Sequence, residues 1–213
     1  MQKVLILAAA LVIAPLAAQA AAPDYNYLDL SLSKASINDF SGGKGYQLDG
    51  SYAFANYWYV AASYGHNSFN GGLLTGGFFT TDEVLAVGGH LALTDSLDLV
   101  GRVAYASDNW KQGPSTNLFP GFTVATSDTQ DGYDFGFGIR AMPLDQLELT
   151  AFIDRDNAGL MSHDHNRAET TGSVGAMYKV TDDFGLGLSY ARGTQSDASN
   201  WMLSGRWYFM PNQ

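Results

Sequence analysis

Apolar side chains alternate with small or polar side chains along stretches of about ten residues that recur through this chain. In the stretch 132–142, Tyr133 and Phe135 share one parity, whereas Asp134 and Arg140 share the other. A period of two is typical of a β-strand whose two faces meet different surroundings. We predict ten such strands, at 25–36, 45–54, 57–67, 82–93, 97–107, 132–142, 147–156, 170–180, 184–192 and 200–209.

The connections between these strands alternate between short and long. Short turns are predicted at 55–56, 94–96, 143–146 and 181–183, and long polar or glycine-rich loops at 37–44, 68–81, 108–131, 157–169 and 193–199. Outer-membrane barrels have short turns on the periplasmic side and longer loops outside the cell. An even number of strands then places both ends of the folded domain on the periplasmic side.

The polar faces of the predicted strands carry charged residues and glycines, so they could not form the core of a soluble β-sandwich. The apolar faces must therefore meet another apolar phase, and lipid is the natural partner. Aromatic residues gather near the strand ends, with Trp58 and Trp207 on the short-turn side and Tyr64 and Trp201 on the long-loop side. We predict an all-β fold, a transmembrane antiparallel up-and-down β-barrel of about ten strands, with eight strands as the alternative and no separate soluble domain.

The first segment of the chain has the layout of a secretory signal peptide. Lys3 supplies a positive charge, a short apolar run follows, and small residues form a cleavage site that ends at Ala20. We expect cleavage after Ala20, with Ala22 as the alternative, so that the signal peptide is 1–20 and the barrel domain is 21–213. The predicted location is the outer membrane, after signal-dependent export.

Composition excludes several classes of function. The chain contains no cysteine, which rules out disulfides, cysteine-based metal sites and a thiol nucleophile. A formal net charge of −10 and the lack of a visible basic patch argue against nucleic-acid binding. Charged residues make up only 15% of the chain, fewer than a soluble protein of this size normally carries, which again favours a membrane setting.

Several short segments are similar to those of a known family. They are Tyr25-Asn26-Tyr27-Leu28, Asp98-Leu99-Val100-Gly101-Arg102-Val103-Ala104-Tyr105, Asp131-Gly132-Tyr133 and Gly138-Ile139-Arg140. On these motifs, and on its layout along the whole mature chain, the sequence resembles the small ten-stranded outer-membrane barrels described from xanthomonads and their relatives. The resemblance implies an outer-membrane location and a barrel fold, and it supplies no catalytic residues.

Charged side chains of both signs are predicted to face the interior of the barrel. They are Asp29, Asp49, His90, Asp98, Arg102, Asp134, Arg140, Glu148, Asp154, Lys179 and Arg206. In one interpretation they form a network of ion pairs, because charges buried in a narrow barrel have to be paired. In the other they line a narrow water-filled passage whose charges select among ions.

A polar cluster near one rim of the predicted barrel suggests further hypotheses. Its members are His163, Asp164 and His165 in a long loop, with Asp154 and Asp156 preceding them near the same rim. A His–Asp pair could activate water in a hydrolase, and two histidines with carboxylates could hold a divalent ion. The third interpretation is a solvated polar loop that carries no chemistry.

We favour a non-enzymatic outer-membrane barrel of structural or surface-interaction type, and we assign it no catalytic, cofactor-binding or metal-binding residues. The alternative function is a narrow passive pore for small solutes or ions, and a less favoured one is a rim-site hydrolase that uses the loop His and Asp residues. The expected partners are outer-membrane lipid, lipopolysaccharide and, during biogenesis, the barrel-assembly machinery. We expect the protein to be a monomer.

Overall fold

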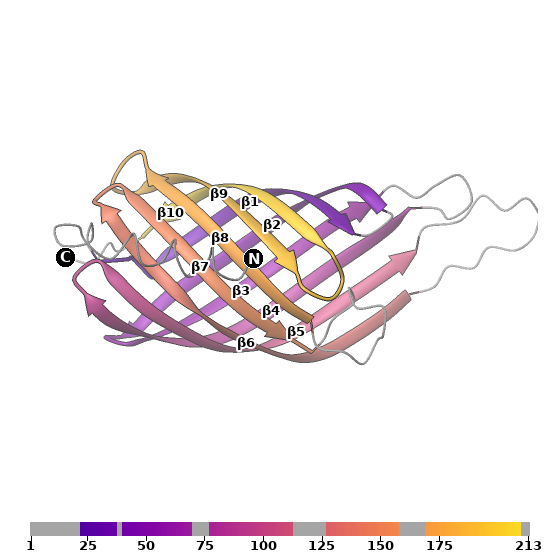
Figure 1. Cartoon of the computed structure of the whole chain (residues 1–213), viewed down its shortest axis with the longest axis horizontal. Coiled ribbons are helices and arrows are strands. Elements are labelled where there is room, and N and C mark those ends of the chain that lie inside the picture. Colours follow the sequence, from indigo (N-terminus) through magenta and orange to yellow (C-terminus); the bar gives the residue numbers. More distant parts are fainter. Residues whose placement is uncertain (1–21, 38–39, 70–76, 113–126, 158–168, 210–213) are drawn as a thin grey trace, which may run out of the picture.

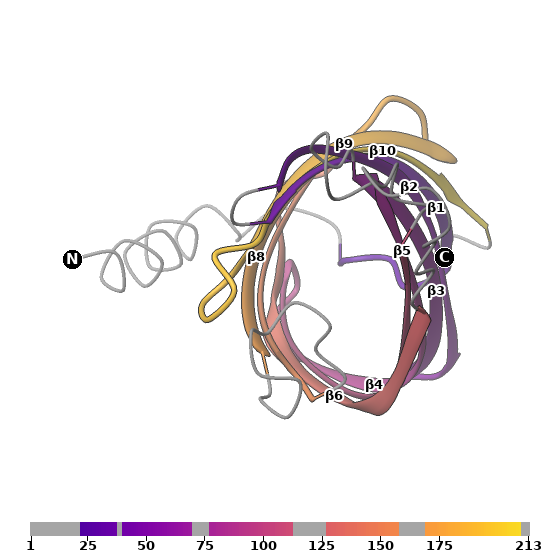
Figure 2. The same cartoon turned by 90° about the vertical axis from the view of Figure 1, so that its right-hand side faces the viewer.

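The structure, a computed structural model, describes residues 22–37, 40–69, 77–112, 127–157 and 169–209, and these form one closed antiparallel barrel (Figure 1; Figure 2). Its ten strands are β1 (Tyr27–Ile37), β2 (Phe40–Ala55), β3 (Trp58–Phe69), β4 (Phe78–Thr94), β5 (Leu97–Gln112), β6 (Ser127–Leu144), β7 (Leu147–Asp156), β8 (Glu169–Lys179), β9 (Phe184–Gly193) and β10 (Ser199–Tyr208). Each strand pairs with its neighbours in sequence, and β1 pairs with β10 to close the ring. The predicted up-and-down barrel is confirmed with ten strands, so the eight-strand alternative is wrong.

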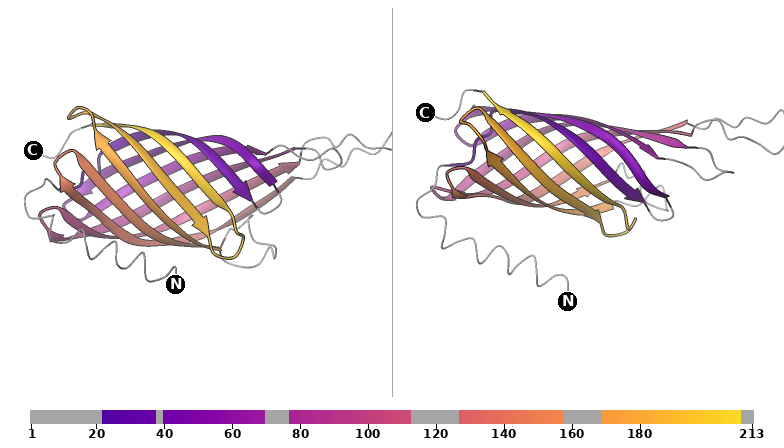
Figure 3. Two further views of the ribbon diagram at one scale, coloured as in Figure 1. Left: turned by 45° about the horizontal axis from the view of Figure 1, so that its top comes forward. Right: turned by 90° about the horizontal axis from the view of Figure 1, so that it is seen from above.

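Both described ends of the chain lie at the same end of the barrel, because Tyr27 at the start of β1 pairs with Tyr208 at the end of β10. The short turns that join β2 to β3, β4 to β5, β6 to β7 and β8 to β9 lie at this end as well. Figure 3 shows the strands running from it at an incline to the barrel axis. Within the described ranges, no helix is long and apolar enough to cross a membrane.

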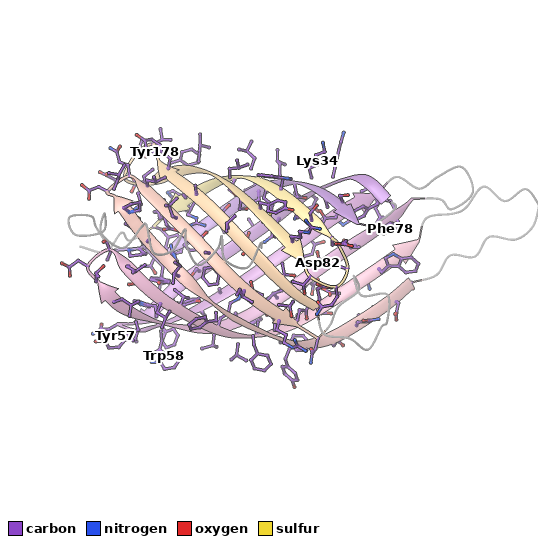
Figure 4. The ribbon with its side chains drawn as sticks, in the orientation of Figure 1. Lys34, Tyr57, Trp58, Phe78, Asp82 and Tyr178 are labelled. Carbon is purple, nitrogen blue, oxygen red and sulfur yellow. The ribbon has the colours of Figure 1, made fainter. Side chains whose placement is uncertain are left out.

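The two faces of each strand meet different surroundings. On β1, Leu30 is 57% exposed, whereas its neighbours Asp29 and Ser31 are buried. Figure 4 shows Trp58 and Tyr178 pointing away from the wall near the short-turn end. The same parity repeats around the ring, so an apolar belt with aromatic margins faces outward and polar groups face the lumen, as expected for a barrel in lipid.

Four strands, β2, β4, β5 and β6, extend farther toward the long-loop end than the apolar alternation predicts. They include Phe78, Lys111 and Asp131, which the alternation assigns to loops. Between β5 and β6 the ladder continues from Ser107↔Asp131 to Lys111↔Ser127, although polar side chains take the outward positions there. Backbone pairing thus outlasts the apolar belt, which is why the predicted boundaries are wrong at this end.

Candidate functional site in the barrel interior

The residues 23–26 do not continue β1 but bend into the lumen at the short-turn end, as Figure 2 shows from the opposite end. All four are buried, and Tyr25 is 3% exposed. The bend begins at Asp24, whose carboxylate accepts a hydrogen bond of 2.9 Å from the backbone N–H of Asn26. Such an Asx turn competes with strand pairing. The prediction that the first strand begins at Tyr25 is therefore wrong, and Tyr25 is a lumen residue.

Asn26 fixes the base of this N-terminal segment to the barrel wall. Its side-chain oxygen accepts a hydrogen bond of 2.9 Å from the backbone N–H of Ala53 on β2. Its backbone carbonyl accepts another, of 3.1 Å, from the backbone N–H of Phe209, just after β10. The segment is therefore tied to strands on both sides of β1.

Tyr25 contacts side chains from four strands across the lumen. Its hydroxyl donates a hydrogen bond of 2.8 Å to Asp98 Oδ2. Its ring stacks on His90 and Tyr59, with centroid distances of 4.2 and 5.2 Å. The guanidinium of Arg140 lies 4.3 Å from the centre of the same ring, within range of a cation–π interaction. Burial raises the pKa of the Tyr25 phenol well above its usual value, so the hydroxyl remains a donor.

A chain of alternating charges lies beside Tyr25. Arg140 and Glu148 form an ion pair of 2.7 Å whose side chains are 6% and 1% exposed. Glu148 also accepts a hydrogen bond of 3.1 Å from Arg206, and Arg206 pairs with Asp29 at 3.0 Å.

Arg140 joins this chain to the N-terminal segment through a hydrogen bond of 2.8 Å to the backbone carbonyl of Asp24. Burial raises the pKa of the Asp24 carboxyl, although its hydrogen bond to Asn26 opposes the shift. Buried charges are costly unless they are paired, and here each guanidinium has a carboxylate partner. The network therefore connects the N-terminal segment with β1, β6, β7 and β10.

Arg102 crosses the lumen nearer to the long-loop end. Its Nη2 lies 3.2 Å from Asp134 Oδ2 and 2.8 Å from Asp154 Oδ1. Gly136 faces both Arg102 and Asp154 in the ladder, and a Cβ at this position would clash with both side chains. The glycine thus makes room for the ion pair. The Arg102 side chain is 32% exposed, so this pair is wetter than that of Arg140.

The structure also places the remaining predicted interior residues. His90 Nδ1 lies 3.0 Å from Asp98 Oδ2, without the geometry of a hydrogen bond. Asp49 accepts a hydrogen bond of 2.7 Å from a glutamine side chain on its own strand. The ammonium of Lys179 lies 4.5 Å from the centre of the Tyr208 ring. All eleven predicted residues lie on the inward parity of their strands.

A polar cavity of about 260 Å³ lies in the lumen, with Tyr25, Arg140 and Arg102 in its wall. The opposite wall carries a row of hydroxyl groups, from Ser31, Thr150, Ser173, Ser189 and Ser204. A second cavity is lined by Asp49 and Asp82, and it shares Arg102 with the first. The lumen has room for water or a small polar solute, and the N-terminal segment lies at its short-turn end.

The carboxylates of the rim hypothesis lie on the inward face of β7. Asp154 pairs with Arg102, and Asp156 lies opposite Asp134 in the ladder. The other members of that cluster lie outside the described residues: His163, Asp164 and His165. In the part of the chain that the structure describes, no group of three or more His, Asp or Glu side chains is placed to hold a metal ion.

Comparison of the sequence with protein families gives one match. Residues 5–158, more than half of the chain, match the model of the family described as outer membrane protein beta-barrel domain. No curated protein matches the sequence significantly.

Several solved structures share the fold. The NanC porin is 13% identical with a TM-score of 0.51, over 86% of this chain and 100% of that one. Ail, the attachment invasion locus protein of Yersinia pestis, is 14% identical with a TM-score of 0.42, over 86% and 95%. The N-terminal barrel domain of Pseudomonas aeruginosa OprF is 12% identical with a TM-score of 0.43, over 87% and 98%. Identities this low show a common fold alone, and the narrower resemblance to xanthomonad barrels stays a prediction.

Proposed function

Because the chain belongs to the family of outer-membrane protein β-barrel domains, and so has its place in the outer membrane, we propose that it is a non-enzymatic barrel of structural or surface-interaction type. In this proposal the N-terminal segment closes the lumen at the periplasmic end, so the barrel supports its extracellular part and does not serve as an open channel. The observation that carries the proposal is the position of Tyr25, which contacts Asp98, His90 and Arg140 across the lumen.

The contacts of Tyr25 are strong enough to keep the segment seated most of the time. A hydrogen bond to a charged group contributes about 1.5–3 kcal/mol, and a cation–π contact about 0.5–2 kcal/mol. Together with the two ring stacks, release of Tyr25 costs roughly 3–6 kcal/mol. Tenfold in an equilibrium corresponds to about 1.4 kcal/mol, so roughly one molecule in 10² to 10⁴ has the segment out of the lumen at any moment.

The extracellular part consists, in the described ranges, of the projecting ends of β4, β5 and β6 (Figure 1). Pairing persists there to Lys111↔Ser127, and Asn109 donates a side-chain hydrogen bond of 2.7 Å to Thr129 on the adjacent strand. A paired sheet that extends beyond the apolar belt is a rigid support for the loops it carries. This supports a role in surface interactions.

The second candidate function is the narrow passive pore. It is favoured by the cavity between Tyr25 and Arg102, whose row of hydroxyl groups suits a polar solute. Conduction through this lumen requires that the N-terminal segment leave its seat at the short-turn end.

Planar-bilayer recording of the unmodified mature protein tests the proposal. We expect no steady conductance, and only brief openings if the segment is released at times. A steady ohmic conductance would overturn the closed lumen and favour the pore. Peptidase and esterase assays of the same preparation should show no activity, whereas an activity that His163→Ala abolishes would overturn the non-enzymatic assignment.

A further inference from the structure

Two lysines face each other directly on the outer wall of the barrel. Lys34 of β1 pairs with Lys44 of β2 in the antiparallel ladder, and both side chains are exposed on the outward parity. Figure 4 shows Lys34 projecting away from the wall in the half of the barrel that carries the long loops. Directly opposed side chains have Cβ atoms about 4.5–5.5 Å apart, so two like charges at such positions destabilise the sheet. An anion between the two ammonium groups removes that repulsion.

No carboxylate among the described residues compensates this pair. The other ladder partners of the two lysines are a tryptophan and a serine. Arg192, by contrast, is an exposed cation that has Asp197 at 3.1 Å. The chain carries 21 Asp and Glu against 11 Lys and Arg, so acids are not scarce in it. The uncompensated positive charge at Lys34 and Lys44 is therefore a local feature of the outer wall.

The lysine pair lies at the margin of the aromatic belt on the long-loop side. Tyr46 and Trp201 beside it are 43% and 51% exposed. Exposed Tyr and Trp mark the level at which hydrocarbon gives way to lipid headgroups. Gly42, the next outward position beyond Lys44, leaves open space, since a Cβ there would meet nothing within 4 Å. Lys34 and Lys44 thus lie at headgroup level with room beside them for a ligand.

We propose that Lys34 and Lys44 together bind a phosphate group of lipopolysaccharide, the lipid of the outer leaflet. Its headgroup phosphates lie at the level of the pair, and one phosphate between the ammonium groups replaces their repulsion with two charge-assisted contacts. The assignment rests on the orientation in the proposed function, in which the long loops face outside. Free inorganic phosphate has the same chemistry, so the test separates the two sources.

The test measures the affinity of purified lipopolysaccharide for the folded protein in detergent, with the folded fraction verified by its heat-dependent gel shift. Lys34→Gln and Lys44→Gln should each weaken binding about fivefold, and the double variant about 25-fold, because a lysine near an anionic headgroup contributes about 1 kcal/mol. The matched control is Lys111→Gln, since Lys111 is also exposed on the outer wall at the long-loop end but is opposed by no lysine. The control should leave the affinity unchanged.

Two further ligands distinguish the sources of phosphate. Dephosphorylated lipopolysaccharide should bind the unmodified chain and the double variant equally, and inorganic phosphate at the same concentration should not bind measurably. Binding of inorganic phosphate as tight as that of the lipid would overturn the lipid assignment. Equal affinity of the double variant and the unmodified chain for intact lipopolysaccharide would overturn the site itself.

Bilayer recordings of the same preparations keep this inference distinguishable from the proposed function. A steady conductance together with the expected loss of lipid affinity overturns the closed lumen alone. A silent bilayer with no loss of affinity overturns the lysine site alone.

Discussion

Replacing Glu148 with Gln removes the negative charge that two buried arginines share. Glu148 is 1% exposed, and its oxygens accept hydrogen bonds from Arg140 at 2.7 Å and from Arg206 at 3.1 Å. Gln has nearly the same shape but offers a single neutral acceptor, so one guanidinium loses its partner. Breaking a buried ion pair from one side costs about 3–5 kcal/mol. Because Arg206 keeps Asp29 as a partner, we expect the lower end, about 3 kcal/mol of unfolding free energy.

Urea unfolding in liposomes, followed by tryptophan fluorescence, measures this loss. With a dependence on urea of about 1–3 kcal/mol per molar, the midpoint should fall by about 1 M or more. The matched control is Asp197→Asn, which removes an exposed ion pair to Arg192 and should cost below about 1 kcal/mol. A loss as small as that of the control would refute the reasoning, because it would show that water in the lumen already solvates both arginines.

Three further changes test the parity, the lumen and the orientation. Arg102→Ala should cost about 2–3 kcal/mol in the same unfolding assay, less than a fully buried pair because Arg102 is one-third exposed; no loss would show that Asp134 and Asp154 need no counter-charge. Val87→Arg should cost about 2–4 kcal/mol at its lipid-facing position, whereas Val87→Ile should be tolerated, and equal tolerance would contradict the parity. An epitope inserted at Ser115 should bind antibody on intact cells and one at Asp145 should not, and the reverse pattern would contradict the orientation.

The strands were predictable because each lipid-facing side chain reports its face locally. Alternation depends on neighbours two residues apart and needs no knowledge of tertiary contacts. The strand expected at 147–156 is found at Leu147–Asp156 for this reason. Where the outward side chains become polar, as beyond Ser107 on β5, the pattern ends although the backbone ladder continues to Lys111. Backbone pairing carries no side-chain signal, so those strand ends could not be predicted.

The inward parity of the charged residues was equally readable, but their partners were not. Arg140 lies opposite Asp98 in the ladder, yet it pairs with Glu148. Register places the Cβ atoms, whereas a long arginine side chain reaches several ångströms and pairs with a carboxylate that lacks other donors. Asp98 already accepts the hydroxyl of Tyr25. The choice of partner therefore depends on a residue whose position the alternation does not report.

Tyr25 escaped prediction because the bend before β1 is made by one side chain. Its alternation with Asn26 and Tyr27 looks like the start of a strand, and only the hydrogen bond from Asn26 to Asp24 turns the chain inward. An Asp two residues before a potential backbone donor is a recognisable turn signal, although it is common in loops. With that signal alone, the lumen and the periplasm are equally available to Tyr25.

The conductance of the Tyr25→Ala variant, recorded beside the unmodified protein in planar bilayers, tests the closed lumen most directly. The substitution removes the hydroxyl that binds Asp98 and the ring that stacks on His90 and Arg140, while leaving the barrel wall unchanged. A chain refolded from Tyr27 onward removes the whole segment and serves as the limiting case. We predict a silent unmodified protein and measurable openings in both variants. Equal conductance in all three would contradict the claim that the N-terminal segment closes this barrel.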